Sequence, residues 1–253
     1  LTSILIQDMD IDRQAFQPSV VYLNGEYWGI HNIREKINSN YLAENHFVDP
    51  DNTNILEYNG SVVEGSSSSY ENLINYVESH TLETEQNYLQ VSQEIDVNNY
   101  IQYELSEIYV NNTDWPGNNV RYWNTNDAES LWRWILYDTD MGFSNWQESA
   151  YTFNTLAYAL EANGPGYPNP PWSTLLFRRM MTNQGFRNEF ANQFADRLNT
   201  NFKYEKVSEV VDSLQQIFLP EINDHLLRWN HSFDNWQNNY IRIKEYARFR
   251  PDY

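Results

Sequence analysis

Four residues in the middle of the sequence have the side chains that a metal-dependent phosphoryl-transfer site needs. Asp114 is followed five residues later by Asn119, and Asp138 and Asp140 stand one residue apart after an aromatic, apolar stretch. In such reactions one carboxylate orients or deprotonates the attacking hydroxyl, while an Asn and another carboxylate hold the magnesium ions that bridge the phosphates. Magnesium prefers oxygen ligands of this kind. The sequence therefore predicts a divalent-metal site for phosphoryl transfer, built from these four residues.

The elements around these residues support that prediction. A helical pattern over 97–108, with Asp96 as its expected N-cap, runs into a loop at 111–117 that carries Asp114. Two strands are then expected at 120–124 and 131–137, with a turn between them. A loop Asp, an Asn five residues on, a short hairpin and a metal-binding Asp is the order found in protein-kinase active sites. The spacing of Asp114 and Asn119 alone is weak, and the combination is more specific.

Two other interpretations of the same residues stay open. Asp114 and Asn119 are also common turn formers, and Asp138 to Asp140 would also suit a strand-ending turn or the calcium loop of a structural domain. Aromatic residues offer a second alternative, because exposed Trp side chains can form a sugar-binding platform, although packing in the core is commoner. The candidates are Trp115, Trp123, Trp132, Trp134, Trp146 and Trp172. The five His residues show no metal-binding spacing.

The first part of the chain predicts a β-hairpin. Residues 20–23 form the first strand, Asn24-Gly25 is a strong turn signal, and residues 27–37 form the returning strand. Alternation along that strand places Ile33, Glu35 and Ile37 on one face and Asn32, Arg34 and Lys36 on the other. Glu35 is then a carboxylate on an apolar face, where a charge is costly unless it is paired. It either reaches solvent or pairs with a structural Arg at the end of the strand, or it borders a ligand cleft. Residues 1–9 are expected to be the tail of a helix.

The rest of the chain predicts mostly helices. Residues 38–65 are polar and irregular apart from a short strand at 55–58, and the Gly/Ser stretch 65–69 is the best candidate for a boundary between lobes. Residues 145–171 are expected to form a long loop rich in Pro, Gly and Asn. Loops of this length within a compact domain are usually functional or mobile. Helices are expected from Tyr70 to Val77 and, near the C-terminus, at 172–181, 186–198, 204–229 and 236–248.

Composition limits the possible partners. The 253 residues include 16 Lys and Arg against 35 Asp and Glu, for a net charge of −19. Such an acidic surface repels the negative charges of nucleic-acid backbones and anionic membranes. Proteins that bind nucleic acids do so mainly through Lys and Arg side chains. No apolar stretch approaches the roughly 20 residues needed to cross a bilayer. The absence of cysteine excludes disulfides and thiolate zinc sites. We therefore expect a globular monomer that neither binds nucleic acid nor inserts into a membrane.

Three segments of the sequence resemble the spore coat protein H (CotH) kinase family of atypical protein kinases. The first runs from Val20 to Ile37 and contains the Asn-Gly turn, Tyr27-Trp28-Gly29 and Glu35-Lys36. The second is Asn111 to Trp123, and the third is Trp134 to Phe143. The third is similar to the family's Trp-Asp-x-Asp-x-x-Phe pattern, with Tyr137 in place of the Trp. The resemblance covers roughly residues 1 to 145, and the C-terminal helices resemble the family less specifically.

The resemblance implies roles for individual residues. Asp114 would be the catalytic Asp and Asn119 a metal-binding Asn, while Asp138, with Asp140 beside it, would correspond to the metal-binding Asp of kinases. Glu35 and Lys36 would lie near the adenine or ribose of the nucleotide. Kinase-like folds place a Gly-rich loop and a phosphate-gripping Lys before these strands, and this chain begins too late to contain them. Lys36 is a weak substitute, because alternation puts it opposite Glu35.

From the residues and the resemblance together we expect an α+β, protein-kinase-like fold. Residues 1–65 would form a truncated small lobe with its β-hairpin, and residues 66–253 a mainly helical large lobe. The resemblance implies transfer of the γ-phosphate of ATP, with Mg²⁺ or Mn²⁺, to Ser or Thr of a protein in the bacterial cell envelope or outside the cell. The main alternative is a non-catalytic pseudokinase or a glycan- or protein-binding surface module on the same scaffold.

Overall fold

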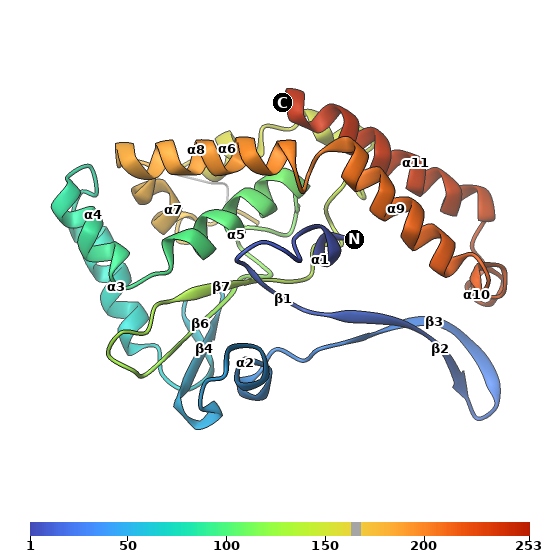
Figure 1. Ribbon diagram of the computed structural model, residues 1–253, viewed down its shortest axis with the longest axis horizontal. Coiled ribbons are helices and arrows are strands. Elements are labelled where there is room, and N and C mark those ends of the chain that lie inside the picture. The colour runs from blue at the N-terminus through green and yellow to red at the C-terminus, as the bar shows by residue number, and fades with distance from the viewer. Residues whose placement is uncertain (163–167) are drawn as a thin grey trace.

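The protein is described by a computed structural model that covers residues 1–162 and 168–253. It is an α+β fold in which a small mixed sheet and a separate β-hairpin lie on one side of a layer of helices (Figure 1). Helix α5 (Val97–Val110) crosses the middle of the molecule and packs on the sheet, and every residue from Asn99 to Val110 is buried. Asp96 caps its first turn, since its side chain accepts a hydrogen bond from the Asn99 amide, as the sequence predicts.

The main sheet has five strands and is mixed. Its order is β1 (Asp12–Arg13), β7 (Arg133–Leu136), β6 (Arg121–Thr125), β4 (Thr53–Glu57) and β5 (Ser61–Glu64). Among the strands that the structure describes, β1 pairs with β7 in parallel, with Asp12 opposite Ile135 and Arg13 opposite Leu136, and the other pairings of this sheet are antiparallel. The predicted strands at 55–58, 120–124 and 131–137 are confirmed within a few residues as β4, β6 and β7. Strands β1 and β5 were not predicted.

The predicted hairpin is confirmed as a two-stranded sheet of β2 (Phe16–Leu23) and β3 (Glu26–Arg34), which stands apart from the main sheet (Figure 1). Asn24 and Gly25 form its turn with φ values of 53° and 85°. Strand β3 ends at Arg34, three residues earlier than predicted. The alternation therefore does not extend to residues 35–37, and the predicted common face is wrong: Ile33 is 65% exposed while Ile37 is buried.

The helices follow the predicted pattern with three corrections. The remaining α-helices are α1 (Thr2–Leu5), α2 (Ser39–His46), α3 (Ser68–Ser79), α4 (Glu85–Ser92), α6 (Thr155–Ala159), α7 (Leu175–Met180), α8 (Gln184–Asn199), α9 (Tyr204–Phe218), α10 (Ile222–Trp229) and α11 (Phe233–Phe249). Short 3₁₀ turns are at Pro50–Asn52, Ala150–Thr152 and Arg250–Asp252. The single helix predicted at 204–229 is wrong, because Pro220 lies between α9 and α10 and cannot continue a helix. Helices α2 and α4 were not predicted.

The third correction concerns the long loop predicted at 145–171. Its described part contains the 3₁₀ turn Ala150–Thr152 and helix α6, which the side chain of Asn154 caps. Residues 163–167 of that loop lie outside the described part of the chain. No helix among the described residues has both the length and the hydropathy needed to cross a bilayer.

Residue 65 marks a tight junction in the structure. Gly65 has φ of +77°, and a Cβ at this position would lie 2.4 Å from the main-chain oxygen of Thr53. The main sheet combines strands from before this residue (β1, β4 and β5) with strands from after it (β6 and β7). The predicted division into lobes at 65–66 thus passes through one sheet, and the lobes themselves stay a prediction.

Four of the six candidate Trp residues belong to the core. Trp115, Trp123, Trp132 and Trp134 are at most 4% exposed and pack with other aromatic rings around α5 and the sheet. The proposed sugar-binding platform is therefore wrong for these four. Of the other two, Trp146 is 72% exposed and Trp172 is half-buried. The core thus holds β6, β7 and α5 rigidly in place, and the acidic loops follow directly from these elements.

Candidate active site

Asp138 and Asp140 lie in the loop that directly follows β7. Asp138 adopts φ of +53°, which is uncommon for a residue other than glycine. Asn111 and Asn119, in the loop after α5, and Phe143 and Ser144, further along the loop after β7, are also left-handed. Such conformations are costly and are found mainly where the surrounding structure holds a functional group in place. The end of β7 therefore presents its carboxylates in a fixed, non-extended turn.

Hydrogen bonds join the Asp114 loop to the Asp138 loop. The side-chain amide of Asn119 donates to the main-chain oxygen of Asp138 at 3.0 Å, and that of Asn112 donates to the same oxygen at 3.5 Å. The side-chain oxygen of Asn112 also accepts a hydrogen bond from the Asp114 amide at 3.3 Å. The structure thus brings together Asp114, Asn119, Asp138 and Asp140, which the sequence predicted as one site.

The carboxylates influence one another electrostatically. Burial raises the pKa of Asp138 above its ordinary value, and the negative charges of Asp140 and Asp114 raise it further. The guanidinium of Arg34 acts in the opposite direction and lowers the pKa of Asp138. A cation placed among these carboxylates would relieve their mutual repulsion, as expected of a metal site.

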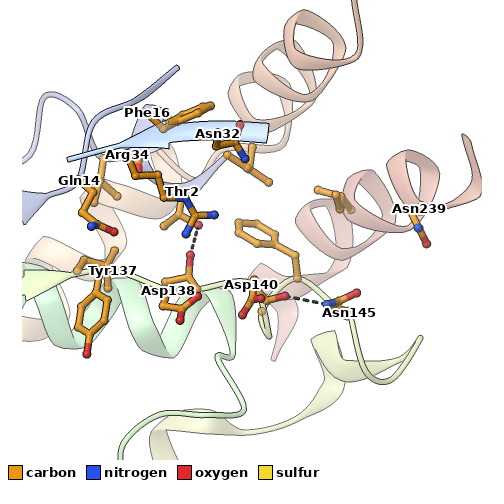
Figure 2. A pocket seen from close by; sticks show the side chains of 18 of the residues that line it. Thr2, Gln14, Phe16, Asn32, Arg34, Tyr137, Asp138, Asp140, Asn145 and Asn239 are labelled. Atoms are coloured by element: carbon orange, nitrogen blue, oxygen red, sulfur yellow. Dashed lines mark hydrogen bonds between the residues drawn. The ribbon is translucent and has the colours of Figure 1, made fainter. Parts of the chain in front are cut away.

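A cavity of about 370 Å³ opens in front of the acidic loop (Figure 2). Asp138 and Asp140 lie on one side of it, and Arg34 extends from β3 toward them from the other side. Arg242 of α11 adds a second basic side chain to the lining. Asp114 and Asn119 do not line the cavity. Asp138 and Asp140 do, and they lie between the cavity and the loop that carries Asp114.

Glu35 and Lys36, the predicted nucleotide-binding pair, do not line this cavity. The Glu35 carboxylate accepts hydrogen bonds from the Ala15 amide at 2.7 Å and from the Asn45 side chain at 3.5 Å, so it joins the start of β2 to α2. Lys36 is exposed. From this part of the chain, Asn32 and Arg34 line the cavity. The alternation had placed these two residues on the opposite face of the strand from Glu35.

Arg34, Arg242 and Asn112 are site residues that the sequence did not single out. The alternation of β3 was a usable signal for Arg34, because it placed this cation on a polar face. No comparable signal existed for Asn112, since its contacts depend on how two distant loops meet.

The donor set fits a magnesium ion that is delivered with phosphates. Within the described residues, no group of three or more His, Cys, Asp or Glu side chains is placed to enclose a metal ion. Magnesium is commonly held by only one or two carboxylates, with phosphate and water oxygens supplying the other ligands. Asp138 and Asp140 can provide such carboxylates. The side-chain nitrogen of Asn119 donates to Asp138, so the side-chain oxygen is the atom that this residue could offer to a metal ion.

An α+β chain with an Asp-bearing loop, a nearby Asn and an acidic pair beside a cavity has the features of a kinase-like enzyme. The chain belongs to the CotH kinase family: the family model described as CotH kinase protein matches residues 1–253, the whole chain. This match confirms the resemblance drawn from the sequence and extends it over the C-terminal helices. A comparison with curated proteins gave no significant match.

Proposed function

We propose that this protein is a metal-dependent atypical protein kinase that transfers the γ-phosphoryl group of ATP to a Ser or Thr hydroxyl of an envelope or extracellular protein. Membership of the CotH kinase family supports the kinase activity. The choice of acceptor and the location outside the cytoplasm follow from the family resemblance. The observation that carries the chemistry is the hydrogen-bonded junction of the Asp114 loop with Asp138, beside a cavity that also contains Arg34.

In this proposal the acidic loops bind the metal ion, and basic side chains in the cavity wall face the phosphates. Asp138 and Asp140, with the oxygen of Asn119, would hold Mg²⁺ or Mn²⁺, which supplies positive charge to the phosphate oxygens when bound. Arg34 and Arg242 offer further positive charge from the cavity wall. A phosphate-binding cation is therefore available within this chain, even though the sequence shows no Gly-rich loop and no phosphate-gripping Lys.

Asp114 would act on the acceptor. The acceptor hydroxyl oxygen forms a bond to the γ-phosphorus, and the bond between that phosphorus and the β,γ-bridging oxygen breaks, so that ADP leaves with the electron pair. The hydroxyl proton passes to the Asp114 carboxylate, the base that orients the attacking oxygen. Asp114 is half-buried and sits in the loop attached to Asp138, where a base close to the metal is required.

The test is phosphate transfer by the native full-length protein. It should be incubated with γ-labelled ATP, Mg²⁺ or Mn²⁺, and a panel of Ser-rich envelope proteins, with the Asp114→Asn variant as the control. Label on an acceptor or on the protein itself, lost in the variant, supports the proposal. No transfer to any acceptor, together with no nucleotide binding, would overturn it in favour of a pseudokinase or a binding module.

A further inference from the structure

Helix α5 carries two carboxyl groups inside the core. Glu104 is 4% exposed and Glu107 is completely buried, and neither forms an ion pair within the described part of the chain. One oxygen of Glu104 and both oxygens of Glu107 have no hydrogen-bond partner of good geometry. An unpaired buried charge is strongly unfavourable, so such groups retain their protons. Burial raises the pKa of Glu104 to about 8 and that of Glu107 well above its ordinary value.

Glu107 lies against the loop that carries Asp114. It belongs to the last turn of α5, which ends at Val110, and Asn111 then reverses the chain in the left-handed conformation. The reversal places the Asn112 side chain, which is 2% exposed, beside the buried Glu107 carboxyl. Asn112 is near enough to lower the pKa of Glu107, although the two groups do not meet with hydrogen-bond geometry. The same Asn112 side chain contacts the Asp114 amide at 3.3 Å and the Asp138 oxygen at 3.5 Å. Both distances are long for hydrogen bonds.

We propose that Glu107 is a positioning residue, whose carboxyl fixes the Asn112 amide so that this amide can hold the Asp114 loop and the Asp138 turn in register. Glu107 touches neither acceptor nor nucleotide, and it acts only through Asn112. The kinetic consequence of this inference rests on the proposed kinase function, whereas its structural consequence does not.

Packing alone gives no reason for a carboxyl group at this position. A side chain of the same length without polar atoms would fill the space, and replacing buried, unpaired polar groups by apolar ones is often neutral or stabilising. Glu107→Met should therefore keep or raise the melting temperature while it impairs the site. A residue that served only the stability of the fold would lose both together, so the two readouts separate the roles.

The experiment compares three variants of the full chain. Glu107→Met should lower kcat by about 10- to 100-fold, the range for a small misplacement of catalytic groups, with little change in KM for ATP. Glu107→Gln keeps a neutral polar group and should retain most of the activity. Glu104→Met is the matched control, because Glu104 contacts Tyr100 on the same helix and should leave kcat unchanged. Hydrogen exchange without nucleotide should rise in residues 111–119 for Glu107→Met alone.

A double-mutant cycle with Asn112→Ala gives the decisive outcome. If Glu107 acts through Asn112, the effects of Glu107→Met and Asn112→Ala on kcat and on exchange are not additive. Additive effects, or wild-type exchange and kcat in Glu107→Met, would overturn the inference. If the wild-type protein transfers no phosphate, the proposed function fails, and the exchange data still decide this inference. Should Glu107→Met not fold, Glu107→Leu, which also removes the polar atoms, takes its place in the cycle, and additive effects with Asn112→Ala contradict the proposal in the same way.

Discussion

The side-chain amide of Asn119 donates a 3.0 Å hydrogen bond to the main-chain oxygen of Asp138, and both residues have left-handed backbones. This bond joins the loop after α5 to the turn after β7. It helps to hold both residues in a backbone conformation that is unfavourable for residues other than glycine. The nitrogen of Asn119 thus positions Asp138, and in the proposed function its oxygen would bind the metal ion. The Asn119 and Asn112 side chains bind main-chain atoms of Asp138 and Asp114 and not their carboxylates, so we expect that these carboxylates can be replaced without unfolding the turn.

Asp138→Ala should abolish the stabilisation of the protein by MgATP. A ligand that binds only the folded state raises the melting temperature, by an amount that corresponds to about 2.7 kcal/mol at 100 times its Kd. The wild type should show this rise in a thermal-shift assay with Mg²⁺ or Mn²⁺ and ATP, and the variant should not. Asp234→Ala, which removes an exposed carboxylate from the first turn of α11, is the control. An equal rise in the Asp138 variant would exclude this residue as a ligand.

Asp114→Asn should slow phosphate transfer by roughly 10²–10⁴-fold, the usual contribution of a general base. MgATP should still raise the melting temperature, because Asp138 and Asp140 remain. The measurements are transfer of labelled phosphate and the thermal shift on the same sample. Loss of both signals together would show that Asp114 belongs to the metal site, and unchanged transfer would show that the base is another group.

The proximity of the four candidate site residues could be predicted, because residue type and chain order carry the information. Asp114, Asn119 and the pair Asp138 and Asp140 occur in a fixed order around a hairpin, and β6, β7 and the capped helix α5 follow from local patterns. The Asn24-Gly25 turn is equally local. None of these features depends on contacts between distant parts of the chain.

Other features depend on contacts that the sequence does not encode locally. Strand β1 has two residues and is defined by their pairing with Ile135 and Leu136 of the neighbouring strand β7, more than 120 residues later in the chain. Nothing in the local sequence indicates this pairing. The role of Glu35 depended on the end of β3, and once this strand ends at Arg34 the Glu35 carboxylate turns to the Ala15 amide. The alternation of side chains does not show at which residue a strand ends, because that end depends on tertiary contacts of the strand.

Arg34→Ala should weaken ATP binding without removing the base. Arg34 lines the cavity opposite Asp138 and lowers the pKa of that residue, so its loss removes positive charge from the phosphate side. We expect KM for ATP to rise about tenfold, which corresponds to about 1.4 kcal/mol, with a smaller change in kcat. Lys36→Ala removes an exposed cation two residues away, outside the cavity, and is the matched control. A larger effect of the Lys36 variant would restore Lys36 as the phosphate-binding residue.

The attachment of the hairpin to α10 should weaken in mild acid. The His225 imidazole accepts a 3.0 Å hydrogen bond from the Ile30 amide through Nδ1, which requires an unprotonated nitrogen. Burial, followed by the charges of His231 and His31, lowers the pKa of His225. The unfolded chain then takes up a proton near pH 6.5, before the folded protein does, so this contribution to stability is complete above that pH and is lost as the pH falls below it.

His225→Gln should therefore flatten the dependence of the unfolding free energy on pH between about 7.5 and 5.5, a window around the ordinary pKa of His. Urea unfolding at several pH values measures this for the wild type, for His225→Gln, and for His80→Gln as an exposed control at the end of α3. Hydrogen exchange of residues 26–34 should rise in the wild type at the lower pH, because the Ile30 amide loses its acceptor. The edge-to-face contact of Trp28 with Trp229 and the Arg228 guanidinium over Trp28 do not titrate in this range, so they should keep the hairpin partly protected. Parallel pH curves for the wild type and His225→Gln would show that protonation of His225 does not weaken the attachment of the hairpin.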